Sequence, residues 1–377
     1  MFATAATVVS VIVPARNEEA CLAFCLESLV AQTGIDFEII VVDDHSSDRT
    51  AELARSFSQA LSCVGAALQT RPVIVIAAPS LPDGWTGKNN AMAAGAKIAK
   101  GKWLLFTDAD TVHKPGSLAR AVAEAEEHGA ALLSYSPEQE VHTFCEKAVM
   151  PVIFAELAAT YPPGKVNDPA SPIAAANGQY LLISREAYDA VGGYTNIATD
   201  ILEDVAMARL VKSSGRKIFF RYGGDAVRTR MYRSWQQMRE GWTKNLALLF
   251  PVPVWTAAWN LILFYSLFAI PAGIVLALAA VVPGSDARLP WAESVYVVGA
   301  ITGFAVIAAM IFSKLAKSNF TTSRVIAVLG LPIFGYLLLK SEYFLRRRSL
   351  NWKGRAYRYG AADLERLRNK NSAIDAQ

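Results

Sequence analysis

Short apolar runs alternate with polar-faced segments along the first 250 residues of the chain. Four of these runs are rich in aliphatic and aromatic residues and end at polar residues; they span 8–14, 37–42, 73–77 and 103–107. Runs of this length and composition are typical of strands that are buried on both faces. Helical segments of about a dozen residues follow them, which favours βαβ units and predicts an α/β fold with a mainly parallel sheet.

The apolar pattern changes after residue 250. Two stretches, 255–282 and 295–312, are almost uninterrupted by polar residues and raise the hydrophobic content of the chain to 53%. Each is about as long as the roughly 20 residues that a helix needs to cross a bilayer. A buried core helix is the alternative for each stretch, but we expect two membrane-spanning helices.

A third and weaker apolar stretch covers 325–345. It has two glycines and a proline in its middle and Lys340 and Glu342 near its end. A third span, a re-entrant segment and an interfacial helix all remain open for it. We therefore divide the chain into three parts. The first domain covers 1–250 and ends with an amphipathic interfacial helix near 231–250. A membrane region at 251–345 and a basic cytoplasmic tail at 346–377 follow it.

The formal net charge of +4 is unevenly distributed along the chain. Acidic residues prevail before Arg209, basic residues cluster beside the apolar stretches, and only the connection at 283–293 lacks a cationic excess. By the positive-inside rule this connection is external, so we predict a multi-pass protein of the inner (plasma) membrane with a cytoplasmic first domain. Basic surfaces also bind nucleic acid, but beside spanning stretches they favour anionic lipid, so no nucleic-acid partner is expected.

Acidic residues follow two of the predicted strands directly. Asp43 and Asp44 come after one strand, and Asp108 and Asp110 come after another. Because ligand sites in parallel sheets lie beyond the carboxyl ends of the strands, these groups are expected to face one crevice. An Asp-x-Asp triplet can share Mg²⁺ or Mn²⁺ with a diphosphate; the alternative is an ordinary solvated turn. His113 could approach such a metal or its phosphates, or it could have only a supporting or surface role.

The pair Asp43 and Asp44 allows two interpretations. One carboxylate could accept hydrogen bonds from a base or a ribose, while the other could cap the helix that begins near Ser47. Capping alone would also explain the pair. Lys88 lies in a glycine-containing turn before a helix of small residues, where a cation is unfavourable for the helix dipole. An anionic ligand is therefore a reasonable partner of Lys88.

A second pair of carboxylates, Glu203 and Asp204, opens a predicted helix. Carboxylates at a helix start interact favourably with the helix dipole, and this effect alone could explain the pair. The functional alternative is that one of them removes the proton from an acceptor hydroxyl as that hydroxyl attacks a sugar carbon.

Five motifs in register make the chain similar to a known family. They are Val-Ile-Val-Pro-Ala-Arg-Asn-Glu-Glu at 11–19, Val-Asp-Asp-His-Ser-Ser-Asp at 42–48, Lys-Asn-Asn-Ala at 88–91, Asp-Ala-Asp at 108–110 and Glu-Asp at 203–204. In order and spacing, over about the first 245 residues, they resemble glycosyltransferase family 2.

This resemblance implies a GT-A fold, which is Rossmann-like, and an inverting, metal-dependent displacement. It also implies roles for particular residues. Asp204 would be the general base, with Glu203 the second choice, and Asp108 and Asp110 would hold Mg²⁺ or Mn²⁺ with the diphosphate. The nucleotide-sugar, with a UDP-sugar as the family default, would contact Pro14, Glu18, Asp43, Asp44, Lys88 and Asp108.

Within the family, the stretches at 81–88 and 166–169 most resemble hopene-associated glycosyltransferases. The segment at 351–357 is similar to a tail of ceramide glucosyltransferases and carotenoid-type glycosyltransferases. All three groups use lipid acceptors, so the resemblance implies a hopanoid, carotenoid or sphingolipid-like acceptor.

One departure concerns the Gln-x-x-Arg-Trp motif of polysaccharide-forming relatives. Here Gln236 and Arg239 are present, but the tryptophan, Trp242, is displaced by two positions. These three residues could still border the acceptor region beside the membrane, or they could belong only to an interfacial amphipathic helix. The displacement argues against processive polymerisation.

Three functions therefore compete. The leading hypothesis is transfer of a sugar to a lipid at the cytoplasmic membrane face. A processive polysaccharide synthase would need more spanning helices than about three. An inactive membrane scaffold of a lipid-biosynthetic complex would not need the carboxylates that the sequence retains. The oligomeric state, the sugar and the nucleotide are left open.

Overall fold

The computed structural model describes residues 7–63, 73–281, 290–320, 324–347, 349–352 and 355–358. The chain divides into two compact units. The first unit comprises Met1–Glu140 and Pro163–Met231, and the second unit comprises Val141–Pro162 and Tyr232–Gln377. This division differs from the predicted boundary at residue 250, because two helices that precede this residue pack within the second unit.

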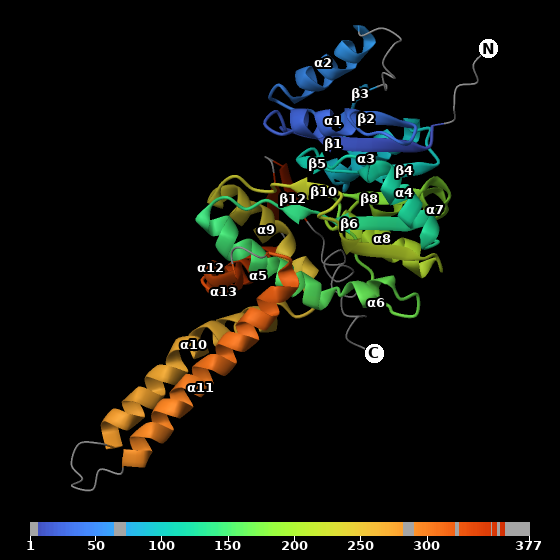
Figure 1. Ribbon diagram of the computed structural model, residues 1–377. Helices are drawn as coiled ribbons and strands as arrows, with labels where there is room; N and C mark the ends of the chain where they lie inside the picture. Colours follow the sequence, from blue (N-terminus) through green and yellow to red (C-terminus); the bar gives the residue numbers. More distant parts are fainter. Residues whose placement is uncertain are drawn as a thin grey trace. The chain divides into compact units, whose positions relative to one another are not determined.

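Within the described residues of the first unit, seven strands form one mixed sheet in the order β3-β2-β1-β4-β8-β6-β9 (Figure 1). Strands β3, β2, β1 and β4 are mutually parallel and so are β6 and β9, whereas β8 runs antiparallel to both of its neighbours. The four predicted strands are confirmed, with ends that differ by at most one residue. The strands are β1 (Val9–Ala15), β2 (Phe37–Asp43), β3 (Val73–Ala77), β4 (Trp103–Phe106), β6 (Leu132–Ser136), β8 (Leu181–Ser184) and β9 (Ile218–Tyr222).

Helices connect these strands, and a small second sheet adjoins them in the first unit. The small sheet has the order β5-β10-β7, with β5 (Thr111–His113), β7 (Glu138–Gln139) and β10 (Val227–Thr229). The helices are α1 (Leu22–Val30), α2 (Thr50–Cys63), α3 (Gly87–Ile98), α4 (Ser117–Glu127), α6 (Pro163–Asn167), α7 (Arg185–Ala190), the 3-10 helix η1 (Gly193–Ile197) and α8 (Glu203–Ser213).

The core of the first unit follows the two-residue period of its strands. Val11 and Val13 of β1 belong to one buried cluster with the apolar side chains of α1 and α4. Ile12 points to the opposite face, where α3 packs very closely: a Cβ atom on Gly95 would lie 2.5 Å from Ile12 Cγ2. A larger residue at position 95 would therefore push α3 away from the sheet.

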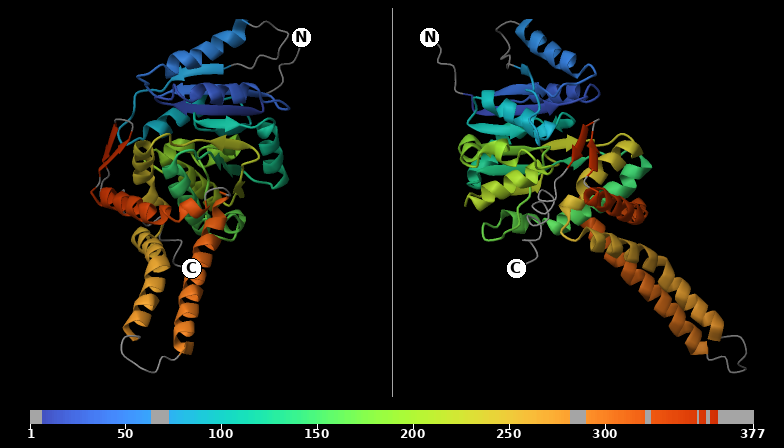
Figure 2. Two further views of the ribbon diagram at one scale, coloured as in Figure 1. Left: turned by 60° about the vertical axis from the view of Figure 1, so that its left-hand side comes forward. Right: turned by 180° about the vertical axis from the view of Figure 1, so that it is seen from behind.

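The described residues of the second unit form helices and their connections, apart from a short hairpin. Helices α5 and α9 both pack against α13, and α10 packs against α11; Figure 2 shows α10 and α11 side by side in both views. The closest approach is at Gly330, where a Cβ atom would lie 1.9 Å from the carbonyl oxygen of Ala148. The elements are α5 (Phe144–Thr160), α9 (Trp235–Leu249), α10 (Pro253–Val281), α11 (Pro290–Leu315), η2 (Ala316–Ser318), α12 (Arg324–Ala327), α13 (Gly330–Arg346), β11 (Ser349–Trp352) and β12 (Arg355–Arg358).

Two stretches of the described helices are long and apolar enough to cross a membrane, judged by length and composition: Pro253–Ile274 and Val297–Ser318. Only 22% of the first and 6% of the second is buried, which is low for core helices. Helix α13 is not among these candidates. The predicted external connection at 283–293 and the predicted tail at 346–377 lie largely outside the described residues.

A polar cluster joins three helices of the second unit. Glu156 of α5, Asn260 of α10 and Lys314 of α11 meet there: Lys314 Nζ donates to Glu156 Oε1 and, at 2.8 Å, to Asn260 Oδ1. Asn260 Nδ2 also donates to Glu156 Oε1, at 2.5 Å. All three side chains are largely buried. Breaking such a buried pair by removing one partner typically costs about 3–5 kcal/mol.

Candidate active site

Parallel strands bring the predicted acidic clusters to one edge of the large sheet. In the sheet register Ala15 of β1 pairs with Asp43 of β2, and Ile12 pairs with Phe106 of β4. The residues that directly follow β2 and β4 therefore lie beyond the same carboxyl edge, where α/β sheets bind ligands.

Lys88 joins two of the predicted carboxylates. It lies in the first turn of α3, and its Nζ is 2.7 Å from Asp108 Oδ1 and 2.7 Å from Glu203 Oε1. Burial would lower the pKa of Lys88, but the two carboxylates outweigh burial and raise the pKa of this amine well above its ordinary value. Three segments that are distant in sequence thus share one ion-pair network around a charged amine.

Asp204 lies beside this network at the start of α8. Its Oδ2 accepts a hydrogen bond from the Gly178 N–H at 2.8 Å, and its Oδ1 accepts one from the Val205 N–H at 2.8 Å. Removal from water, helped by the charge of Glu203, raises the pKa of Asp204 to about 6, although Lys88 and both N–H groups oppose the shift. Such a carboxylate is mostly ionised at neutral pH and is a stronger base than an ordinary aspartate.

Gly178 is a site residue that the sequence analysis missed. A Cβ atom on Gly178 would lie 3.2 Å from Lys88 Nζ, 3.2 Å from Glu203 Oε1 and 3.5 Å from Asp204 Oδ2. The absent side chain therefore leaves room for three charged groups, while the backbone N–H orients one of them. The only signal in the sequence is a glycine that follows a run of small residues at 174–176.

Asn89 was also missed, although it follows Lys88 directly. Its side-chain nitrogen donates to three backbone carbonyls, those of Ile197 at 2.8 Å, Ala198 at 3.1 Å and Asp200 at 3.0 Å. No short-range pattern indicates these contacts, because they join positions more than a hundred residues apart.

His113 is a buried, uncharged residue and not a surface residue. It is 3% exposed, and burial lowers the pKa of its imidazole to about 3. Its Nε2 lies 3.2 Å from Thr107 Oγ1, which itself donates to the Gln179 carbonyl at 2.8 Å. Of the two predicted roles, the structure favours the supporting one, at the end of β4.

The pair Asp43 and Asp44 does not cap the following helix. Asp43 Oδ1 accepts a hydrogen bond from the Ser46 N–H at 3.2 Å, within the turn after β2. Helix α2 begins at Thr50, and Asp48 Oδ1 accepts from the Thr50 N–H at 3.0 Å. The capping interpretation is therefore wrong for the pair, because the chain makes a turn before the helix starts.

Asp44 is held from the side of β1. Arg16 Nη1 donates to the Asp44 carbonyl at 2.7 Å and lies 3.8 Å from its Oδ2. Pro14 pairs with Val42 in the sheet, and the N–H of Glu18 donates to Thr50 Oγ1 at the start of α2, at 2.8 Å. The predicted nucleotide-binding residues of β1 and β2 thus flank one another, and their role stays a prediction.

Asp108 and Asp110 provide only oxygen ligands. Hard cations such as Mg²⁺ and Mn²⁺ prefer such donors. Among the residues that the structure describes, no group of three or more His, Cys, Asp and Glu side chains is placed to hold a metal ion. Two carboxylates alone do not form a closed protein cage, so a cation held by them would need further ligands, and a metal-binding role of Asp108 and Asp110 stays a prediction.

The predicted acceptor residues Gln236, Arg239 and Trp242 all lie on α9 in the second unit. Trp242 is only 4% exposed, and its ring packs edge-on against Phe154 and Tyr232. Gln236 is exposed and donates to a neighbouring glutamate on the same helix. Trp242 is thus a packing residue of the second unit, and a role of the three residues toward an acceptor stays a prediction.

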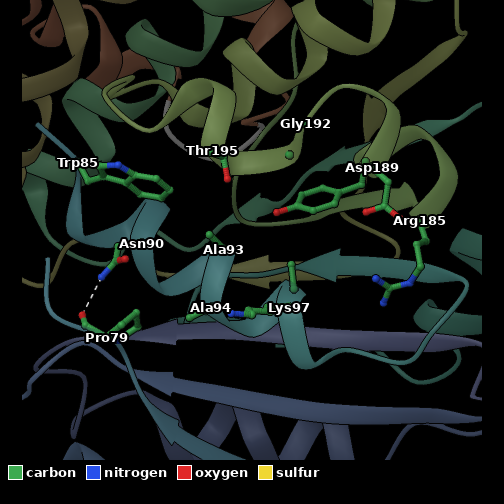
Figure 3. Close-up of a pocket in the computed structure, with 13 residues that line it drawn as sticks. Pro79, Trp85, Asn90, Ala93, Ala94, Lys97, Arg185, Asp189, Gly192 and Thr195 are labelled. Carbon is green, nitrogen blue, oxygen red and sulfur yellow. Dashed lines mark hydrogen bonds between the residues drawn. The ribbon is translucent and has the colours of Figure 1, made fainter. Parts of the chain in front are cut away.

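A pocket of about 580 Å³ lies along α3 in the first unit (Figure 3). Its wall includes Trp85, Lys97 and Arg185, and Asn90 donates to the Pro79 carbonyl at its margin. The Arg185 guanidinium is already bonded to two backbone carbonyls. None of the predicted site residues lines this pocket, so we assign it no role.

Comparison with known proteins places this geometry in context. The chain is 28% identical over 246 residues to 4,4'-diaponeurosporenoate glycosyltransferase of Staphylococcus aureus, covering 63% of this chain and 60% of that protein. The match thus spans less than two thirds of the curated relative's length.

Among solved structures, the fold is similar to that of a mannosyltransferase from Pyrobaculum calidifontis in complex with GDP-Man and Mn²⁺. The TM-score is 0.50, the sequence identity is 16%, and the match covers 90% of this chain and 87% of the other. This likeness supports the GT-A-like mixed α/β fold. Residues 10–191 match the family described as Glycosyl transferase family 2. This match covers just under half of the chain and supports the predicted family for residues 10–191.

Proposed function

We propose that this protein transfers a sugar from a nucleotide-sugar donor to the hydroxyl or carboxyl oxygen of a lipid acceptor at the cytoplasmic face of a membrane. The observation that carries the proposal is the environment of Asp204. Its carboxylate is held by the Gly178 N–H beside the Lys88 ion-pair network, and its pKa is raised to about 6. A base of this strength, next to a cation, suits a reaction in which an acceptor loses a proton as an anionic group leaves.

In the proposed reaction Asp204 takes the proton of the acceptor hydroxyl while the hydroxyl oxygen bonds to the anomeric carbon of the sugar. The bond from that carbon to the nucleoside diphosphate breaks with inversion, and the diphosphate leaves with the bonding electrons. Lys88 would stabilise the departing negative charge. An acceptor carboxylate would need no such base, so dependence on Asp204 distinguishes the two acceptor types.

The donor is proposed to bind along the carboxyl edge of β1, β2 and β4. Asp43 and Asp44, with Pro14 and Glu18 alongside, would contact the nucleoside. A Mg²⁺ or Mn²⁺ ion held by Asp108 and Asp110 would supply positive charge to the diphosphate. The mannosyltransferase of similar fold was solved with GDP-Man and Mn²⁺, which supports this class of donor and metal.

The membrane and the lipid acceptor rest on two supports. The stretches Pro253–Ile274 and Val297–Ser318 expose apolar side chains over most of their length. The relative from Staphylococcus aureus is named for a carotenoid-type acceptor. We propose that both stretches cross the membrane and that α13, which exposes Tyr336 and Tyr343 on one face, lies in the interface.

The test uses membranes from cells that produce the full chain, with Mn²⁺, total lipid extract and a panel of nucleotide-sugars. Asp204→Asn is compared with the wild type, and Asp36→Asn, an exposed residue before β2, is the matched control. For a hydroxyl acceptor we expect a new glycolipid with the wild type and the control, but not with Asp204→Asn. A glycolipid formed by all three proteins would indicate a carboxylate acceptor. A long water-soluble polymer would instead support a polysaccharide synthase. Absence of both donor binding and donor hydrolysis would support an inactive scaffold.

A further inference from the structure

Asn89 holds the segment that leads into α8. Its side chain is fully buried, and its nitrogen lies within 2.8–3.1 Å of the carbonyl oxygens of Ile197, Ala198 and Asp200. The N–H of Thr86 adds a fourth bond to the same segment, at 2.9 Å from the Ala198 carbonyl. One side chain thus contacts three carbonyls of this turn, of which those of Ile197 and Ala198 also accept a backbone N–H, from Asp200 and Thr86 respectively.

The turn at 197–200 ends shortly before the residues that carry the proposed chemistry. Helix α8 begins at Glu203, and its N-cap residue, Leu202, makes no side-chain capping bond. A helix start without a cap depends on its surroundings for its position. The Asn89 contacts are side-chain bonds that hold the chain shortly before this start.

Asn89 itself is held firmly at the start of α3. Asn89 lies in the first turn of α3, and its own N–H donates to Thr86 Oγ1, the N-cap of that helix. Lys88 is its direct neighbour, and Lys88 Nζ contacts Glu203 of α8. The two helix starts, one with the cation and one with the carboxylates, are therefore joined through Asn89.

We propose that Asn89 is a positioning residue, which sets the place of Asp204 relative to Lys88 by clamping the turn at 197–200. This inference rests on the proposed function, in which Asp204 is the base. Asn89 does not touch the reacting atoms in this scheme. It acts through the main chain that precedes Asp204.

The chemistry of the clamp restricts which residue can serve. Three carbonyl oxygens converge on a nitrogen that carries two hydrogens, so one N–H is shared between two acceptors. The side chain must therefore present N–H groups at this length. Asn89 Oδ1 has no hydrogen-bond partner within the described ranges, which shows that the amide contributes its donors. An aspartate of the same size would present oxygen to three oxygens, and an alanine would leave the carbonyls without this donor.

The adjacent Asn90 provides a matched control. It is also an asparagine of α3 and 4% exposed, and its nitrogen donates to one carbonyl, that of Pro79, at 2.9 Å. It makes no described bond to the turn at 197–200. Asn90→Ala therefore removes a buried amide from the same helix turn without opening the clamp.

The first measurement does not require activity. Hydrogen exchange is followed by mass spectrometry in the full chain for the wild type, Asn89→Ala, Asn89→Asp and Asn90→Ala. We expect the peptides that contain Gly178 and Val205, whose N–H groups bind Asp204, to exchange about tenfold faster or more in both Asn89 variants. Asn90→Ala should leave both peptides at the wild-type rate.

The second measurement uses the proposed reaction. Displacement of a base by about 1 Å can lower the rate by about a hundredfold, so kcat should fall about 10- to 100-fold in Asn89→Ala. The KM for the donor should change less than about threefold, because the described bonds of Asn89 go to Thr86 and the turn at 197–200, and not to the predicted nucleoside-binding residues Asp43 and Asp44. Asn90→Ala should keep both constants within about threefold of wild type.

The outcomes separate this inference from the proposed function. If Asn89→Ala folds and leaves exchange of the Gly178 and Val205 peptides unchanged, or if Asn90→Ala changes them as much, the clamp is refuted whatever the activity. Faster exchange restricted to the Asn89 variants supports it even where the wild type shows no transfer. A wild type that shows no transfer would overturn the proposed reaction but would leave the clamp in place. Equal losses in kcat for both asparagines would identify a general folding effect.

Discussion

Replacing Asp204 by asparagine should make the first unit more stable at neutral pH while it removes the proposed base. The carboxyl group has an ordinary pKa of 3.8 in the unfolded chain and a pKa of about 6 in the folded protein. A raised folded-state pKa favours folding at low pH, and that contribution is lost as the pH rises through about 6. Asparagine resembles the neutral acid, so Asp204→Asn does not undergo this loss.

The size of the effect follows from the shift. At about 1.4 kcal/mol for each pKa unit, a change from 3.8 to about 6 corresponds to at most about 3 kcal/mol above pH 7. Asp204 keeps some contact with solvent, so the measured value should be smaller. The amide also presents an NH₂ group to one peptide N–H, which costs about 1 kcal/mol at every pH. The pH-dependent part is therefore the diagnostic quantity.

The assay is urea unfolding of the full chain between pH 4 and pH 8, followed by hydrogen exchange in the peptides of β1 and β4. These peptides report the first unit alone. We expect the stability of Asp204→Asn minus that of the wild type to increase by about 1–3 kcal/mol from pH 4 to pH 8.

Asp225→Asn provides a control of opposite sign. Its hydrogen bond to Arg221 lowers the pKa of Asp225, so this carboxylate stabilises the fold above its ordinary pKa and loses that effect as the pH falls. That loss falls mostly below pH 4 and the side chain is 52% exposed, so the change of Asp225→Asn between pH 4 and pH 8 should stay well below about 1 kcal/mol. If the Asp204→Asn difference were the same at pH 4 and pH 8, the argument from burial would be refuted.

Three further substitutions test other parts of the site. Gly178→Ala places a methyl group 3.2 Å from Lys88 Nζ and Glu203 Oε1, so we expect kcat to fall about tenfold with an unchanged circular dichroism spectrum; an unchanged kcat would contradict the crowding. Lys88→Met leaves Asp108 and Glu203 without their shared cation. The urea midpoint should therefore fall by the equivalent of about 1–3 kcal/mol, and a higher midpoint would show that this ion-pair network destabilises the fold. Asp48→Ala removes the acceptor for the Thr50 N–H and should cost about 1 kcal/mol by urea unfolding at pH 7; no loss would mean that water replaces the cap.

The fold was predictable where local patterns suffice. The apolar runs at 8–14 and 103–107 identified strands because a buried strand excludes charge from both faces. The pairing of β8 between β4 and β6 was not predictable, because antiparallel insertion depends on contacts that are remote in sequence. The two stretches after residue 250 were recognised in a similar way, because long runs almost without polar residues are unusual in composition.

The candidate site was predictable for charged residues, because their side chains indicate a chemical role directly. Lys88, Asp108 and Glu203 were proposed from their places at element starts and ends, and the structure brings them within ion-pair distance. Gly178 was missed because a glycine has no side chain to indicate a role. Asn89 belongs to one of the quoted motifs, but its role was missed because its hydrogen bonds reach residues more than a hundred positions away. Their importance lies in what the folded chain places around them.

The polar cluster of Glu156, Asn260 and Lys314 has a consequence for how the protein is made. Glu156 is synthesised 158 residues before Lys314, which at 5–20 residues per second is an interval of about 8–32 s. During this interval the ribosome produces the remainder of the first unit and the whole of α10. A chain released before Lys314 keeps a carboxylate that no ammonium neutralises, so the second unit can pack fully only after both long helices have emerged.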